Sequence, residues 1–219
     1  MPIRDLLDRL LDLLFPDRCV ACGRTGALLC ARCRAGLRPY PPEDPPAGLD
    51  GMAVGWLYEG AMRKAIHRMK YSRMRRVAAP LGDLLAEHLL AAPQPADALM
   101  AVPLHAGRLA ERGFNQSEEL AVRLARRTGL PLVPGLARCR DTGHQASLGR
   151  RARRGNVEGA FIWDVHAPPP ARVLVVDDVL TTGATLAACA DALRGAGTRE
   201  VRAVALARSL APGQKMIQS

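Results

Sequence analysis

The stretch VLVVDDVLTTGATL, residues 173–186, limits the fold more than any other part of this 219-residue chain. An unbroken apolar run ends at two aspartates, Asp177 and Asp178, and a loop of small residues leads from them into a helical pattern. An apolar run without polar alternation predicts a strand buried on both faces, as in a parallel sheet. We therefore expect an α/β protein in which this strand passes through a short loop into a helix.

Strands and helices alternate through the rest of the chain. Strands are predicted at 52–58, 97–103, 172–178 and 200–207, and helices at 61–70, 77–91, 115–129 and 184–194. Ser117 is the candidate N-cap of the third helix. Alternation of this kind predicts a parallel sheet covered by helices on both faces.

The loop after the two aspartates has the composition of an anion site. Ligands of open parallel sheets bind beyond the carboxyl ends of the strands, where a helix N-terminus offers unpaired N–H groups and a positive dipole. Hydroxyl donors and a close backbone approach at glycine would come from Thr181, Thr182, Gly183, Ala184 and Thr185. Two carboxylates beside a phosphate site suit ribose hydroxyls or Mg²⁺. The stretch therefore predicts a site for a sugar phosphate.

Other interpretations of this stretch are weaker. No GxxxxGK[ST] occurs, which argues against a P-loop, and no GxGxxG follows a strand, which argues against dinucleotide binding. An aspartyl-phosphate enzyme would have its nucleophile at a similar strand end, but it would not need a threonine-rich anion loop directly afterwards. The remaining alternative is an acidic strand end followed by an ordinary turn.

Four of the six cysteines form a pattern near the N-terminus. Cys19 and Cys22 make one CxxC pair, and Cys30 and Cys33 make a second. Two such knuckles complete a tetrahedral site of four thiolates, for which zinc is the usual metal. Because a closed site has no open coordination position, we expect a structural zinc ion. Redox-active or unliganded thiols are the alternative.

Composition divides the chain into parts. Prolines 39, 41, 42, 45 and 46 predict a stiff linker without regular structure. The predicted parts are an N-terminal helix with a zinc ribbon (1–40), a Pro-rich linker (41–50), a main domain (51–212) and a tail (213–219). The first 14 residues read as an amphipathic helix that packs on the rest of the chain, with a membrane surface or a partner as the minority interpretation.

No apolar run approaches the roughly 20 residues that a membrane span needs. Acidic residues interrupt the N-terminal leucines, so no signal peptide is predicted, and the cytoplasm is the expected compartment. The net charge of +10 suits polyanions such as nucleic acid or phosphate-rich small molecules. Seven Lys or Arg residues lie within 60–82 and six Arg residues within 138–154. The alternative for both clusters is a solvated basic face.

The Asp-Asp stretch closely resembles the phosphoribosyl pyrophosphate (PRPP) signature of type I phosphoribosyltransferases. The chain from about Leu14 to Arg208 resembles one branch of them, the ComF family. The segments that carry this resemblance are LLFPDRCVACG, LCARC, MKYSRM, AVPLHAGRLAERGFNQSEELA, HQASLGRRARRGNVEGAF and the Asp-Asp stretch itself. The resemblance implies a type I phosphoribosyltransferase fold with a small N-terminal zinc ribbon.

The resemblance also implies roles for individual residues. Asp177 and Asp178 would be the catalytic pair that contacts the ribose hydroxyls of PRPP, and residues 181–185 would hold its 5′-phosphate. A pyrophosphate-binding segment would consist of Leu104, His105, Ala106, Gly107 and Arg108. The RGFNQ block that should flank the site is Arg112, Gly113, Phe114, Asn115 and Gln116. Four residues match further family positions without an assigned role: Lys70, Gln145, Arg153 and Asn156.

Two functions of different class follow. The first is an enzyme that binds PRPP with Mg²⁺ and transfers its phosphoribosyl group to an acceptor that the sequence does not identify. The second is a non-catalytic protein of natural transformation that binds single-stranded DNA or competence proteins.

Many relatives carry a second set of cysteine pairs, whereas this chain has one set. Residues 138–156 are expected to form a hood over the site.

Overall fold

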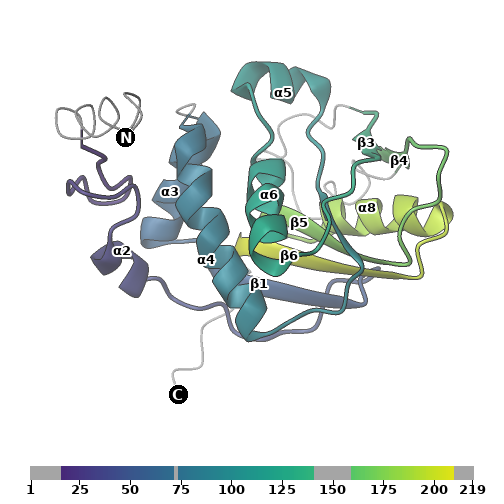
Figure 1. Cartoon of the computed structure of the whole chain (residues 1–219), viewed down its shortest axis with the longest axis horizontal. Helices are drawn as coiled ribbons and strands as arrows, with labels where there is room; N and C mark the ends of the chain where they lie inside the picture. Colours follow the sequence, from purple (N-terminus) through teal and green to yellow (C-terminus); the bar gives the residue numbers. More distant parts are fainter. Residues whose placement is uncertain (1–15, 72–73, 141–158, 210–219) are drawn as a thin grey trace, which may run out of the picture.

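The computed structural model describes residues 16–71, 74–140 and 159–209. Its centre is a four-stranded sheet of order β1-β6-β5-β2 in which every pairing is parallel (Figure 1). These strands are β1 (Gly51–Leu57), β2 (Ala98–Ala101), β5 (Arg172–Leu180) and β6 (Glu200–Arg208). The predicted parallel sheet is therefore confirmed. The lengths of the strands differ from the prediction. The strand β5 continues two residues beyond Asp178, to Leu180, and β2 has four residues where seven were predicted.

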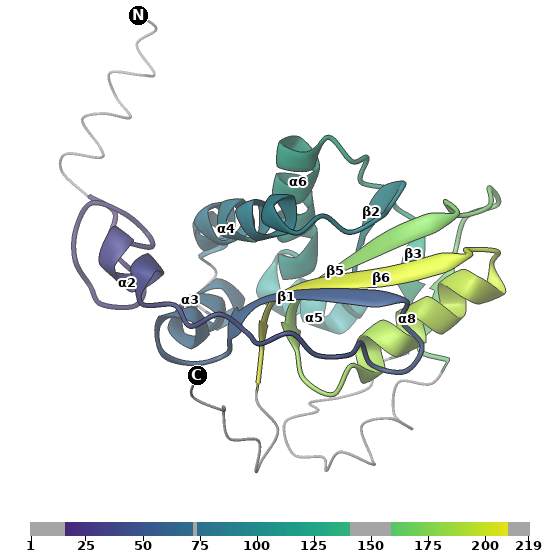
Figure 2. The same ribbon diagram turned by 90° about the horizontal axis from the view of Figure 1, so that it is seen from below.

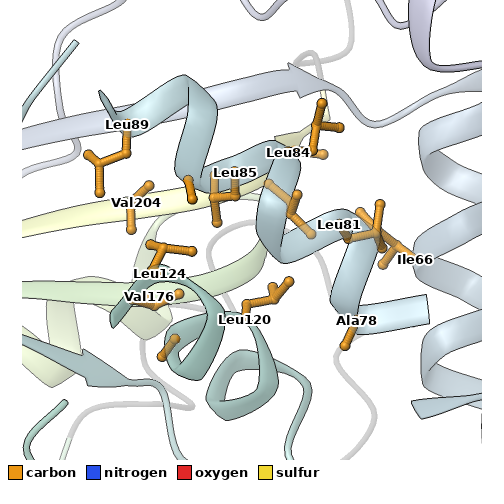
Figure 3. Close-up of a cluster of buried hydrophobic side chains, with 14 of the residues drawn as sticks. Ile66, Ala78, Leu81, Leu84, Leu85, Leu89, Leu120, Leu124, Val176 and Val204 are labelled. Carbon is orange, nitrogen blue, oxygen red and sulfur yellow. The ribbon is translucent and has the colours of Figure 1, made fainter. Parts of the chain in front are cut away.

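Helices cover both faces of the sheet (Figure 2). The described helices are α2 (Ala31–Ala35), α3 (Gly60–Tyr71), the 3₁₀ turn η1 (Arg75–Val77), α4 (Ala78–Ala91), α5 (Ala106–Arg112), α6 (Gln116–Thr128) and α8 (Ala184–Gly195), of which α2 and α5 bury no residue. One core joins α3, α4 and α6 to the sheet, with Leu85, Leu124 and Val204 among its buried side chains (Figure 3). A second core joins α8 to the opposite face.

The strand β5 shows why its apolar run carries no polar alternation. Leu174 and Val176 belong to the core under α4 and α6, whereas Val173 and Val175 belong to the core under α8. All four side chains are at most 1% exposed. Because successive side chains point to opposite faces of a sheet, a strand covered on both sides needs apolar residues at every position.

A small antiparallel pair was not predicted from the sequence. The strands β3 (Leu136–Arg138) and β4 (Phe161–Trp163) form a separate two-stranded sheet. Phe161 is 4% exposed and packs in the core that contains α8. These strands flank most of the predicted hood, whose residues 141–156 lie outside the described part of the chain. The predicted N-terminal helix and the tail at 213–219 also lie outside it.

The Pro-rich segment has no regular secondary structure, but it packs closely on the main domain. The backbone N–H of Tyr40 donates to Gly55 O at 3.0 Å, beside β1. Farther along, the Asp50 carboxylate pairs with Arg194 of α8 at 2.6 Å. Pro46 lies against Gly183, because a Cβ added to that glycine would come within 2.6 Å of the proline ring. We call residues 39–50 the strap.

The cysteine-rich segment lies against α3 and α4 (Figure 2). The Lys64 ammonium of α3 donates to Ala21 O at 3.2 Å, within the first CxxC pair. Val20, Leu29 and Leu37 pack against the core that contains α3 and α4. Ion pairs Arg76–Asp17 and Arg34–Glu87 add to this contact. The segment therefore shares apolar and polar contacts with the main domain.

Candidate functional site

A cavity of about 350 Å³ opens at the carboxyl ends of β2 and β5. The chain leaves β2 toward α5 and α6 and leaves β5 toward α8, and α6 and α8 cover opposite faces of the sheet. Neighbouring strands whose connections diverge in this way create a crevice, which is where open α/β sheets bind ligands. The predicted position of the site therefore coincides with a cavity.

The two aspartates line this cavity but have different surroundings. Asp178 is buried, and its Oδ1 lies 2.8 Å from the Lys70 ammonium of α3. Asp177 Oδ1 accepts hydrogen bonds from the Ser117 hydroxyl at 3.0 Å and from the backbone N–H of Asp178 at 2.8 Å. One carboxylate is thus paired with a cation, and the other is held by neutral donors.

These surroundings shift the protonation equilibria of the site. Burial, followed by the neighbouring charge of Asp178, raises the pKa of the Asp177 carboxyl to about 7. Burial alone would lower the pKa of Lys70, but the Asp178 carboxylate opposes this and raises the pKa above its ordinary value. Lys70 therefore stays protonated at neutral pH, whereas Asp177 changes charge near it.

The start of α6 corrects one prediction from the sequence. Asn115, not Ser117, is the N-cap, and its side-chain oxygen accepts from the Ser117 N–H at 3.1 Å. The Asn115 amide nitrogen donates to Val102 O at 3.0 Å, at the carboxyl end of β2. Both residues favour N-caps, so local preference did not separate them. Because Asn115 serves as the cap, the Ser117 hydroxyl is available to contact Asp177.

The segment between β5 and α8 has the form of an anion-binding loop. Gly183 is the N-cap of α8 and has a φ of +82°, which glycine adopts without steric cost. Thr181 and Thr185 line the cavity. The Thr182 hydroxyl accepts from the Ala184 N–H at 3.4 Å. The 12-residue α8 thus directs its positive N-terminal end toward the side of the cavity that carries threonine hydroxyls.

The segment predicted to bind pyrophosphate is partly helical. Leu104 and Arg108 line the cavity. Ala106, Gly107 and Arg108 form the first turn of α5, and the His105 ring caps that helix by accepting from the Gly107 N–H at 3.3 Å. This helix was not predicted from the sequence, because α5 buries no residue and so has no apolar periodicity to reveal it.

The remaining predicted residues divide into three groups. Arg112 and Gln116 line the cavity, and the Arg112 guanidinium donates to Gln116 Oε1 at 2.8 Å. Gly113 ends α5 in the left-handed region, and Phe114 is buried in the core. Gln145, Arg153 and Asn156 lie outside the described residues.

Several cavity residues were not predicted from the sequence. Tyr58, Tyr71 and Arg138 line it, and Arg112 stacks over the Tyr71 ring at 5.3 Å. Only tertiary structure brings these residues together. The contact between Ser117 and Asp177 was also not predicted, because it joins residues that lie 60 positions apart in the sequence.

The four N-terminal cysteines form the predicted cluster. Their sulfur atoms all lie within 4.8 Å of one another, and Cys22 Sγ and Cys30 Sγ are 3.7 Å apart. Four sulfurs bound to one zinc ion at about 2.3 Å would be about 3.8 Å apart, so the cluster fits zinc. Without a metal, the pKa values of two of these thiols move apart: burial is outweighed by backbone N–H groups, which lower the pKa of Cys19 to about 6, whereas burial and the neighbouring sulfurs raise the pKa of Cys33 to about 12. A structural zinc site is therefore supported.

The described cations of the predicted basic cluster at 60–82 have three kinds of surroundings. Arg63, Lys64 and Arg68 of α3 are exposed, Lys70 faces the cavity, and the two arginines of η1 form ion pairs. No helix in the described ranges combines the length and apolar character that crossing a bilayer requires.

Comparisons with known proteins agree with this architecture. The phosphoribosyl transferase domain family matches residues 115–216, and the double zinc ribbon domain family matches residues 10–45. DNA utilization protein YhgH of Salmonella typhimurium is 32% identical over 201 residues, which cover 88% of this chain and 84% of that protein. Competence protein F of Haemophilus influenzae is 35% identical over 130 residues, which cover 58% of this chain and 56% of that protein.

A solved structure also shows similarity to part of the chain. Glutamine PRPP amidotransferase from B. subtilis, complexed with ADP and GMP, is 26% identical with a TM-score of 0.41. The match covers 59% of this chain and 26% of that one. The 32% identity to the Salmonella protein over 88% of this chain, together with the two domain matches, establishes the family to which the chain belongs. This chain belongs to the ComF family, and it combines a match to the phosphoribosyl transferase domain with a match to the N-terminal double zinc ribbon.

Proposed function

We propose that the cavity binds PRPP together with Mg²⁺ and that the protein transfers the phosphoribosyl group to an acceptor. The observation that carries this proposal is the meeting of a carboxylate pair and a helix N-terminal loop in one cavity. Carboxylate oxygens suit ribose hydroxyls or a hard cation, and the loop suits a phosphate. The family matches support the same ligand class.

The residues divide the ligand between them in this proposal. Asp177 and Asp178 hold the ribose hydroxyls, and the loop 181–185 receives the 5′-phosphate. Arg108 and the backbone near Leu104 face the pyrophosphate. Mg²⁺, when bound with PRPP, would neutralise charge on the departing pyrophosphate. The protein contributes mainly by fixing the sugar in position and stabilising the charge that leaves.

Calorimetry of PRPP with Mg²⁺ tests this proposal. We expect binding by the wild type and loss of binding in the double variant Asp177→Asn, Asp178→Asn. Asp191→Asn is the matched control, because Asp191 is exposed on α8 and does not line the cavity. If the folded, zinc-loaded wild type binds no PRPP, the sugar-phosphate proposal is wrong. Binding would lead to a screen of acceptors for pyrophosphate release.

A second candidate function is binding of single-stranded DNA in DNA uptake or utilization. It is favoured by the exposed cations Arg63, Lys64 and Arg68 on α3 and by the names of the related proteins. Salt dependence separates this function from incidental binding by a cationic protein. Specific binding should persist near physiological salt with a steep log–log slope, whereas incidental binding should disappear there.

A further inference from the structure

The carboxylate of Asp177 is held from a neighbouring structural element. The Ser117 hydroxyl, in the first turn of α6, donates to Asp177 Oδ1 at 3.0 Å, and the Asp178 N–H donates to the same oxygen at 2.8 Å. Ser117 is 4% exposed and lines the cavity beside both aspartates. With two donors on Oδ1, Oδ2 is the oxygen that we expect to accept from a ligand hydroxyl.

Ser117 is itself fixed by two further contacts. Its backbone N–H donates to the side chain of Asn115, and the Asn115 amide donates to Val102 O after β2. This chain of hydrogen bonds ties the carboxyl end of β2 to the carboxylate on β5. Within this chain of hydrogen bonds, the Ser117 hydroxyl is the group that contacts the Asp177 carboxylate.

We propose that Ser117 is a positioning residue, which acts through Asp177 by donating to its carboxylate and so stabilising the charged form that receives the sugar hydroxyls. This inference rests on the proposed function for its ligand, because it assumes that Asp177 receives ribose hydroxyls. Its structural part concerns only the carboxylate and its donors. That part can be measured without any ligand.

Several charged or titratable groups surround Asp177. Asp178 lies beside it on β5 and raises its pKa, whereas Lys70 from α3 lowers it. Burial raises the pKa of the Cys189 thiol on α8, and the nearby charge of Asp177 raises it further. Arg112 and Arg138 line the same cavity. The Ser117 hydrogen bond lowers the Asp177 pKa, so its loss should raise it.

The first test is a ¹³C-carboxyl NMR titration of the ligand-free, zinc-loaded protein, with Asp177 assigned by Asp177→Asn. We expect Ser117→Ala to raise the Asp177 midpoint by about one pH unit, the scale of one hydrogen bond to a charged group. Ser117→Thr keeps the hydroxyl and should restore the wild-type midpoint. Thr128→Ala is the matched control, because it removes a hydroxyl from the far end of α6 that bonds only to local backbone.

The second test measures PRPP affinity in the presence of Mg²⁺ as a function of pH. With a midpoint near 8 instead of 7, Ser117→Ala should bind about five-fold more weakly at pH 7 and nearly as well as the wild type at pH 9. A deficit from general structural damage would persist at pH 9.

The two tests fail separately. An unchanged Asp177 midpoint in folded Ser117→Ala overturns the inference, whatever the protein binds. Absence of PRPP binding by the wild type overturns the proposed function, and the carboxyl titration then still decides whether Ser117 controls Asp177. A weaker affinity that does not recover at pH 9 also contradicts the positioning role.

Discussion

Substituting Gly183 by Ala should destabilise the protein through two separable effects. Gly183 has a φ of +82°, and holding a residue with a Cβ in this conformation costs about 1–2 kcal/mol. The new Cβ would also lie 2.6 Å from Cβ and Cγ of Pro46 in the strap. Overpacking of this kind costs about 1–3 kcal/mol. The free energy of unfolding should therefore fall by about 2–5 kcal/mol.

A second glycine in the same backbone conformation isolates the contact with the strap. Gly129 ends α6 with a φ of +77°, and a Cβ added there meets nothing within 4 Å. Gly129→Ala should thus cost only the backbone term, about 1–2 kcal/mol. The difference between the two variants measures the clash with Pro46. Urea unfolding of the zinc-loaded protein gives both values.

A double-mutant cycle completes this test. Pro46→Gly removes both clashing carbons, so Gly183→Ala should cost about the same in the Pro46→Gly background as Gly129→Ala does in the wild type. Equal losses for Gly183→Ala and Gly129→Ala in the wild-type background would refute the reasoning. The strap would then not support the anion-binding loop.

Three further predictions concern the site and the metal. PRPP binding should strengthen as the pH rises through about 7 and level off above it, because Asp177 must lose its proton before it can accept hydrogen bonds from the ribose hydroxyls. Calorimetry at a series of pH values should show a flatter dependence of the affinity on pH for Asp177→Asn. Lys70→Met should lower the free energy of unfolding in urea by about 3–5 kcal/mol, because it leaves buried Asp178 without its cation. Lys70→Arg keeps a cation and should lower it less. Equal losses of stability in the two variants would contradict the ion pair. Cys30→Ser should abolish zinc binding and lower Tm, as followed by metal analysis and thermal melting, and an unchanged Tm in metal-free protein would argue against a structural zinc.

The main sheet was predictable because burial on both faces leaves a strong mark in the sequence. The apolar run of β5 follows from its burial in both cores, and the helical pattern of α8 follows from its packing on one of them. The short strands β3 and β4 leave no such mark, since three residues are too few to show a period. The helix α5 was missed because it buries no residue.

The candidate site was predictable where its residues are close in sequence. Asp177, Asp178 and the loop 181–185 form one continuous signal. Lys70 was identified only through the resemblance to the family, because its contact with Asp178 depends on how α3 packs beside the sheet. The contact between Ser117 and Asp177 depends equally on tertiary structure. No local pattern encodes a contact between separate elements.

The zinc ribbon and the strap both contact structural elements that border the cavity. The ribbon contacts α3 through Lys64 and Ala21, and α3 carries Lys70 into the cavity. From the ribbon the chain continues into the strap, where Pro46 lies against Gly183 at the start of α8. The ribbon thus contacts the helix that carries Lys70, and the strap contacts the loop 181–185. Because the ribbon is short and has little core of its own, we expect the four thiolates and a bound metal to hold its fold, and with it the contact between Ala21 and Lys64.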